Sequence, residues 1–259
     1  MLIRIILIAF LAGVLGSVVG GVLGLIVKRP SKFYISNMLG FAAGAMIGVS
    51  VFELIPESYE YGSLFTVVIG VILGVLFILG LNLLNRNNQP QDLYSLEDNK
   101  NILSGDEISE NEKKALNRIG IAIFISMALH SLPEGFAIGA GEYLGIGLLL
   151  GIVFFLHFIP EGMAIAVPLK AGGTKHSKII LLCFLAGLPV VVGGIIVYFL
   201  SSFEFLLPYT LSFASGAMLY TVMADMLPTA YSYTKKNKIL TMIIILGMIS
   251  MFILQHLIH

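Results

Sequence analysis

Charged residues are scarce in this chain. Asp, Glu, Lys and Arg make up only 12% of its 259 residues, whereas 58% are hydrophobic. Roughly a quarter of the residues in a soluble domain are charged, so this composition excludes an ordinary soluble protein. The chain is predicted to be an all-α polytopic membrane protein, because long apolar runs span a bilayer as helices.

Cysteine is nearly absent as well. The single one, Cys183, excludes a disulfide within the chain, and its position in an apolar run favours a packing role. The first apolar run lacks the features of a secretory signal peptide, because it is longer than a typical signal core and no A-x-A-like site follows. We therefore expect it to be the first transmembrane helix.

Apolar runs of about 20 residues, the length that crosses a hydrocarbon core of roughly 30 Å, mark the transmembrane helices. We place eight of them, at 2–27, 35–57, 63–84, 118–141, 145–169, 178–200, 206–230 and 239–257. Residues 1–259 are thus predicted to be a single membrane domain. The one long connection, 85–117, is acidic and has no histidine, which favours a solvated linker over a metal sensor.

Cationic residues are almost missing from one face of this predicted bundle. The loops after the first, third, fifth and seventh helices, with the adjoining helix ends, hold every Lys and Arg except Arg4. Lys and Arg near membrane ends favour the cytoplasmic side, so both termini are predicted to lie outside a plasma or inner membrane.

Two segments far apart in the chain share one pattern. Residues 41–46 read Phe-Ala-Ala-Gly-Ala-Met, and residues 213–218 read Phe-Ala-Ser-Gly-Ala-Met. An acid and a proline follow in step, as Glu53 and Pro56 in the first copy and Asp225 and Pro228 in the second. By helix count the two copies run in opposite directions, which indicates an inverted repeat of three helices on each side of a central pair. Transporters are often built in this way.

The central pair carries the strongest signal. The pattern H-x-x-P-E-G-x-A-I occurs at residues 130–138 and again at 157–165. Residues four apart share one face of a helix, so His130 projects with Glu134, and His157 projects with Glu161. The connection between the two helices is short, which makes them antiparallel neighbours and brings all four side chains to one depth. A carboxylate inside a membrane is costly and usually functional.

Two imidazoles and two carboxylates suit a borderline divalent ion such as Zn²⁺. The same set accepts Fe²⁺, Mn²⁺, Co²⁺ or Cd²⁺. Two carboxylates in a low-dielectric interior repel each other, and a dication cancels their charges. Pro133 and Pro160 also free the carbonyls of Leu129 and Leu156 beside the histidines. These features predict a metal site in the membrane.

Other polar side chains in the spans are candidate pathway residues. Glu53 and Glu57 fall near the outer end of the second predicted helix, and Asp225 falls near the cytoplasmic end of the seventh. For each acid an interfacial position explains the sequence equally well. Ser131 and Met46 complete this set.

At these residues the chain resembles the ZIP (Zrt/Irt-like) family of metal transporters, particularly its GufA-like bacterial members. The resemblance rests on the two H-x-x-P-E-G units and the eight-helix pattern, and it covers essentially the whole chain. It implies uptake of zinc or a related divalent ion, a three–two–three inverted repeat, and a homodimer in which helices one, four, five and six move as a unit. Metal ion and membrane lipid are the expected partners, with no nucleic acid.

The chain departs from the family pattern at a second metal position. Many members carry an oxygen ligand directly after each of the two histidines and a glutamate in helix six. Here those places hold Ser131, Phe158 and, by alignment of residues 186–190, Val190. The resemblance therefore implies one strongly bound metal rather than two.

Two rival functions fit parts of the pattern. A ceramidase-like intramembrane hydrolase uses a metal to activate water, but the chain has no H-E-x-x-H motif, and both candidate bases are already used as ligands. A proton-conducting or purely structural membrane protein does not account for the doubled site. We therefore expect a transporter without a catalytic residue.

Overall fold

The computed structural model describes residues 1–26, 32–84, 110–200, 204–232, 234 and 237–258. Within these ranges the secondary structure is helical and contains no strand. In chain order the elements are α1 (Leu2–Ala9), the π-helical turn η1 (Phe10–Leu15), α2 (Gly16–Ile26), α3 (Lys32–Val49), the π-helical turn η2 (Ser50–Leu54), α4 (Ile55–Glu60), α5 (Leu64–Leu84), α6 (Glu110–Leu144), α7 (Gly147–Ala171), α8 (His176–Leu200), the 3-10 turn η5 (Glu204–Leu206), α9 (Leu207–Thr221), the π-helical turn η6 (Val222–Met226), α10 (Leu227–Ser232) and α11 (Asn237–Ile258).

The helices overlap all of the predicted spans. Among the described residues, seven helical stretches are long and apolar enough to cross a membrane, which confirms a multi-pass membrane protein. The predicted span 206–230 is helical but is not one of the seven. It carries serine, threonine, tyrosine and Asp225 and is largely buried by other helices, so its sequence is less apolar. The total of eight spans therefore stays a prediction.

One helix begins well before its predicted start. α6 begins at Glu110, whereas the apolar run predicted a start near residue 118. A carboxylate oxygen of Glu110 accepts a hydrogen bond from the Lys113 ammonium at 2.8 Å. This pair supports a helical turn that hydropathy does not detect, and its hydrogen bond lowers the pKa of the exposed Glu110 carboxyl.

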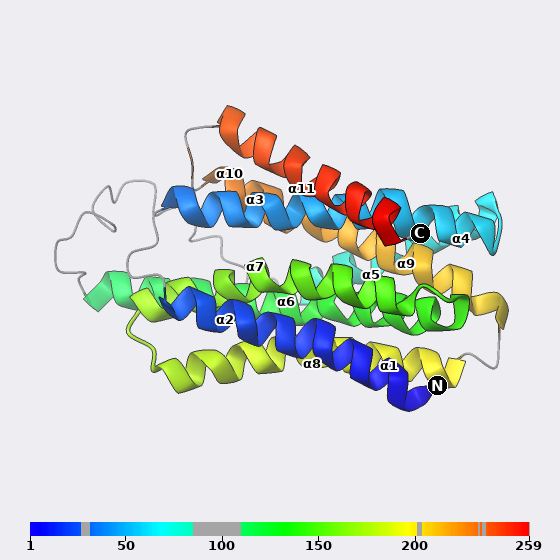
Figure 1. Cartoon of the computed structure of the whole chain (residues 1–259). Helices are drawn as coiled ribbons and strands as arrows, with labels where there is room; N and C mark the ends of the chain where they lie inside the picture. The colour runs from blue at the N-terminus through cyan, green and yellow to red at the C-terminus, as the bar shows by residue number, and fades with distance from the viewer. Residues whose placement is uncertain (27–31, 85–109, 201–203, 233, 235–236, 259) are drawn as a thin grey trace.

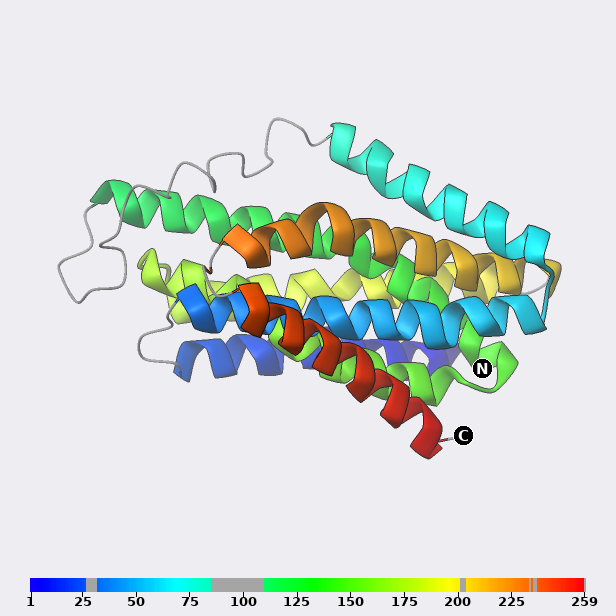
Figure 2. The same ribbon diagram turned by 90° about the horizontal axis from the view of Figure 1, so that it is seen from above.

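The helices form two bundles, which lie one above the other in Figure 1. The central bundle, named for the α6–α7 pair, consists of α1, η1, α2, α6, α7 and α8. The flanking bundle consists of α3, η2, α4, α5, α9, η6, α10 and α11. Contacts between the bundles run mainly from α6 to α9 and from α3 to α7. Figure 2, seen from above, places α5 beside α9 and both termini at one end of the molecule.

Glycines bring helix backbones together inside each bundle. In the central bundle a Cβ on Gly20 would meet the Ile159 carbonyl of α7. In the flanking bundle a Cβ on Gly44 would meet the Ile244 carbonyl of α11. For every described glycine with a close neighbour, the nearest atoms belong to the same bundle. Backbone-level packing therefore fixes each bundle internally and does not join the two.

The π-helical turns η2 and η6 occupy equivalent places in the two copies of the sequence pattern. η2 begins at Ser50 and η6 at Val222, nine residues after Phe41 and Phe213 respectively. π-helical turns are uncommon in proteins, and many of those that occur lie at functional sites. The two copies thus share a local backbone feature in addition to their sequence.

Candidate metal centre

The centre is built on two helices that a tight turn brings side by side. Gly145 adopts a φ of +89° between α6 and α7, a conformation that favours glycine. The Ile146 N–H donates to the Gly141 carbonyl at 2.8 Å and closes the turn. α6 and α7 then run antiparallel with Pro133 and Pro160 inside them, which places the two repeated units opposite each other.

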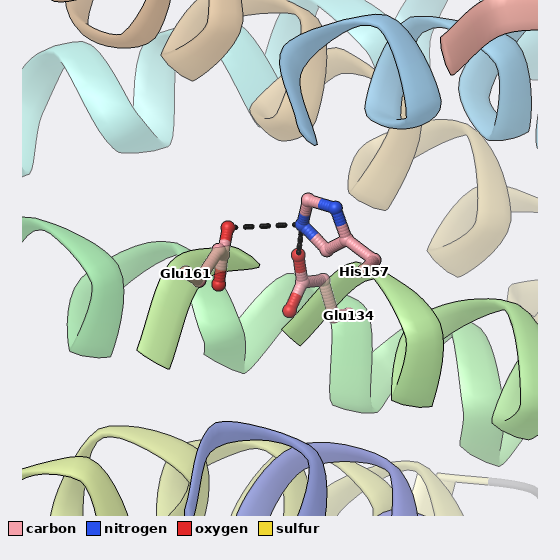
Figure 3. A group of neighbouring side chains, drawn as sticks. All are labelled: Glu134, His157 and Glu161. Atoms are coloured by element: carbon pink, nitrogen blue, oxygen red, sulfur yellow. Dashed lines mark ion pairs between the residues drawn. The ribbon is translucent and has the colours of Figure 1, made fainter. Parts of the chain in front are cut away.

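Three of the predicted ligands meet between these helices. Figure 3 shows the side chains of Glu134, His157 and Glu161 converging, with the first from α6 and the others from α7. They are buried, with exposed fractions of 0%, 2% and 1% respectively. Their ligand atoms lie within 4.8 Å of one another. The His157 Nε2 is 2.9 Å from the Glu161 Oε1 and 3.6 Å from the Glu134 Oε1.

This geometry suits a divalent cation. Two carboxylates this close in a buried site repel each other when both are charged, and a dication between them offsets that repulsion. Nitrogen and oxygen ligands of this kind are those that Zn²⁺ takes in proteins. The compact arrangement around Nε2 is therefore one that a single metal ion can occupy.

His130, the fourth predicted ligand, lies in α6 one turn before Glu134. Its side chain is outside the described part of the structure, so its role as a ligand stays a prediction.

Ser131, Phe158 and Val190, which the resemblance aligns with a second metal position, contact other protein atoms. The Ser131 hydroxyl donates to the Met127 carbonyl of its own helix at 2.7 Å. Phe158 and Val190 are buried. A Cβ added to Gly16 of the first pass would lie 2.9 Å from the Phe158 Cβ, and one on Gly13 would lie 2.6 Å from the Val190 Cγ2. Both apolar side chains thus pack against glycines of η1 and α2.

The candidate pathway residues lie in the flanking bundle, apart from Ser131. Glu53 in η2 is only 4% exposed. It lines a small hollow between the bundles together with Leu149 and Val153 of α7 and Met251 of α11. Val153 is one helical turn from His157, so this hollow adjoins the α7 face that carries the candidate metal ligands.

The other members are spread along the flanking bundle. Met46 is buried in α3, whereas Glu57 in α4 and Asp225 in η6 are half-buried. None of them belongs to the three-residue cluster found among the described side chains. Their pathway roles stay predictions.

Sequence reasoning did not single out two features of the surrounding helices. Glu142, near the end of α6, is a buried carboxylate whose Oε1 is 2.8 Å from the Nε of Arg4. Arg4 is the one cation on its predicted face, which was a signal that an acid would be its partner. The second feature is a ring contact between Phe136, which follows the first P-E-G unit, and Phe213, which begins the second repeat copy.

Comparison with known proteins identifies the family. The family model for the ZIP zinc transporters matches residues 3–255. The zinc transporter ZupT of Chlorobium chlorochromatii is 32% identical over 228 residues, covering 83% of each chain. The zinc transporter ZupT of Akkermansia muciniphila is 32% identical over 262 residues, covering 95% of this chain and 94% of its own. Protein zntB of Dictyostelium discoideum is 28% identical over 303 residues, covering 96% of this chain and 81% of its own. A buried Glu-His-Glu cluster between two membrane helices and a match over nearly the full length lead to one conclusion: the chain belongs to the ZIP zinc transporter family.

Proposed function

We propose that this protein transports zinc, or a related divalent ion, across the membrane toward the cytoplasm through the cluster of Glu134, His157 and Glu161. The observation that carries the proposal is the burial of these three ligands within 4.8 Å of one another in membrane-spanning helices. An intramembrane ionisable cluster is costly unless it serves an ion. The names of the ZupT relatives support zinc as the ion.

In this proposal the side chains replace the water shell of the entering ion. The two carboxylates offset its charge, while the His157 Nε2 supplies a neutral nitrogen ligand. We place His130 on the open side of the same ion. Fe²⁺, Mn²⁺, Co²⁺ and Cd²⁺ fit the same ligand types and are candidate competing substrates.

The two-bundle architecture supports a mechanism in which the metal site moves as part of a rigid body. Glycine-mediated backbone contacts hold each bundle together, and the interface between them lacks such contacts in the described residues. We propose that the central bundle, which corresponds to helices one, four, five and six, moves against the flanking bundle. We further propose a plasma or inner membrane location with outside termini, a three–two–three inverted repeat, lipid contact and a homodimer.

One metal per protomer is part of the proposal. Phe158 and Val190 present apolar atoms where a second dication would need oxygen ligands, and a poorly solvated charge there is costly. Titration calorimetry on the purified protein should give one strong zinc site per protomer. Two equally occupied metals a few ångströms apart, seen by anomalous scattering, would contradict this part of the proposal.

A hydrolase is not supported, because the family match is to transporters. The test compares two activities of one preparation. Zinc flux into sealed proteoliposomes should be high, and release of fatty acid from lipid amides should be absent.

The carboxylate pair provides the decisive variant. Glu134→Gln keeps the shape of the side chain and removes one charge that balances the dication, so zinc flux should be lost. Glu60→Gln, the same change at an exposed position at the end of α4, is the matched control and should transport normally. Normal zinc uptake by Glu134→Gln would exclude this cluster as the transport site.

A further inference from the structure

An aromatic contact joins the two bundles close to the metal ligands. Phe136 of α6 and Phe213 of α9 have ring centroids 5.7 Å apart and planes tilted by 41°, which is within the range of favourable aromatic pairs. By contrast, the pairs Phe10–Phe184 and Phe77–Phe213 each lie within one bundle. The Phe136–Phe213 contact therefore links two bodies that glycine packing does not join.

Phe213 is held firmly in the flanking bundle. A Cβ on Gly74 of α5 would meet the Phe213 carbonyl, and one on Gly216 would meet the Val71 carbonyl. The Phe77 ring lies 5.3 Å from the Phe213 ring on the side of α5. Because backbone packs on backbone at Phe213 and again at Gly216, the backbone that carries the Phe213 ring shifts only if α9 and α5 move together.

Phe136 is held equally firmly to the metal site. It lies two residues after Glu134, which is about 3 Å along the helix axis. Between them, a Cβ on Gly135 would meet the Val190 carbonyl of α8. α6 therefore has no room to shift against α8 at this point, and the height of the Phe136 ring follows the height of the Glu134 carboxylate.

We propose that Phe136 and Phe213 are positioning residues, whose ring contact holds the metal site at one height relative to the flanking bundle. The inference rests on the proposed transport function, because it assigns the contact a place in the movement of the central bundle. One turn along α9 from Phe213 lie Tyr209 and Ala217. Displacing α6 by about one turn, 5.4 Å, replaces the ring contact with one of these side chains. The two ends of the movement thus differ in this contact.

The test removes the ring on either side of the interface. Phe136→Leu and Phe213→Leu each keep a buried apolar side chain and lose the aromatic contact. Phe77→Leu is the matched control, because it removes the other ring that touches Phe213 without crossing between bundles. Zinc affinity, measured by calorimetry, should stay within about twofold in all three variants, because none of these rings is a metal ligand.

The position of the bundles needs a direct readout. The Tyr61 hydroxyl of the flanking bundle donates to the Leu144 carbonyl of the central bundle at 3.4 Å. With Cys183→Ala removing the native thiol, the pair Tyr61→Cys and Leu144→Cys allows cross-linking by a short bifunctional thiol reagent. Its yield at short times reports the fraction of molecules in the present arrangement.

We expect the equilibrium constant in favour of the present arrangement, obtained from the cross-linking yield, to fall roughly two- to tenfold in Phe136→Leu and in Phe213→Leu, as the loss of one aromatic pair predicts. The double variant should fall no further than the stronger single variant, because both remove the same contact. Phe77→Leu should cross-link like the parent, and so should Phe136→Tyr, which keeps a ring.

Three results would overturn the inference: unchanged cross-linking in both single variants, fully additive effects, or an equal fall in Phe77→Leu. If a leucine variant no longer binds zinc, Phe136→Met or Phe213→Met replaces it in the same comparison. Zinc flux by the parent protein is scored separately. Absence of that flux counts against the proposed function, whereas the cross-linking pattern alone decides the role of the ring contact.

Discussion

The two bundles differ in how much charge their buried polar groups concentrate. In the flanking bundle, hydroxyls donate to helix carbonyls, as Ser36 does to Ala230 at 2.7 Å and Ser58 to Pro208 at 2.8 Å. In the central bundle, two carboxylates and an imidazole converge on one point. Hydroxyl–carbonyl bonds leave no charge to balance, whereas two buried carboxylates side by side are costly without a counter-ion. The contrast separates a bundle whose buried polar groups are mostly neutral from one that concentrates buried charge.

Glu53 is a buried charged group of the flanking bundle, and its position is consistent with this contrast. It is a buried carboxylate of the flanking bundle, but it lines the hollow that faces α7 of the central bundle. This buried acid therefore lies on the side where an ion passing between the bundles would meet it.

The largest expected effect comes from removing charge in the central bundle. Glu161→Gln should lower zinc flux by roughly 100-fold or more, since changes even to the partners of metal ligands typically lower metal affinity 10- to 100-fold. Flux into proteoliposomes under a zinc gradient measures this. A flux within tenfold of the parent would place the ion elsewhere and remove the distinction between the bundles.

The second-largest effect is expected from substitutions that separate two packed helices inside a bundle. Gly20→Ala in the central bundle and Gly44→Ala in the flanking bundle each push a methyl group onto a carbonyl of the neighbouring helix. Overpacking of this kind costs about 1–3 kcal/mol of unfolding free energy. Unfolding titrations in mixed detergent measure the loss.

Gly80→Ala is the control for this pair, because nothing lies within 4 Å of the added methyl group. It should leave stability unchanged or raise it by about 0.5–1 kcal/mol. An equal loss of unfolding free energy in Gly80→Ala would mean that alanine destabilises any membrane helix at a glycine position. The losses at Gly20 and Gly44 would then not be evidence for backbone contacts between helices.

A smaller effect is expected from a hydroxyl of the flanking bundle. Ser36→Ala removes the donor to the Ala230 carbonyl and should lower stability by about 0.5–1.5 kcal/mol, with flux within twofold of the parent. Thermal unfolding and zinc flux of the same preparation test both halves. A large fall in flux without a change in stability would give this serine a role in transport. The flanking bundle would then not differ from the central bundle in the way described above.

The smallest effect separates two acids of the same helical pass. Glu57 is half-buried, so Glu57→Gln should raise the apparent KM for zinc about two- to threefold at 10 mM salt, where charges act over roughly 30 Å, and less at 0.1 M. Glu53 is 4% exposed, so any effect of Glu53→Gln should not depend on salt. Flux at the two ionic strengths distinguishes them, and the reverse pattern would contradict their assigned positions.

The helices and the cluster of Glu134, His157 and Glu161 were predictable because both leave periodic patterns in the sequence. Apart from the start of α6, which lies eight residues before its predicted place, apolar runs gave the helix bounds to within a few residues. The four-residue spacing in each H-x-x-P-E unit placed His157 and Glu161 on one face of α7. The short turn at Gly145 then set Glu134 opposite them. Each of these inferences needs only local geometry.

Features that depend on contacts between distant parts of the chain could not be predicted from local sequence patterns. The burial of Glu53 results from α7 and α11, which lie about 100 and 200 residues further along the chain. The π-helical turns at Ser50 and Val222 were foreshadowed only by the matching acid and proline that follow. The contact of Phe136 with Phe213 depends on how two separate bundles meet, which no periodicity encodes.

The order of the helices along the chain has a consequence for biogenesis. The first pass packs its glycine face on α7, and Arg4 pairs with Glu142 at the end of α6, yet α3, α5 and their loops are synthesised in between. During translation the first helix must therefore wait in the bilayer, beside helices of the other bundle, until the α6–α7 hairpin arrives. The flanking bundle waits longer, because α3 acquires its partner α11 only after all the other described helices have been synthesised. Such long-range pairing is slow, and it exposes early helices to quality control before their partners exist.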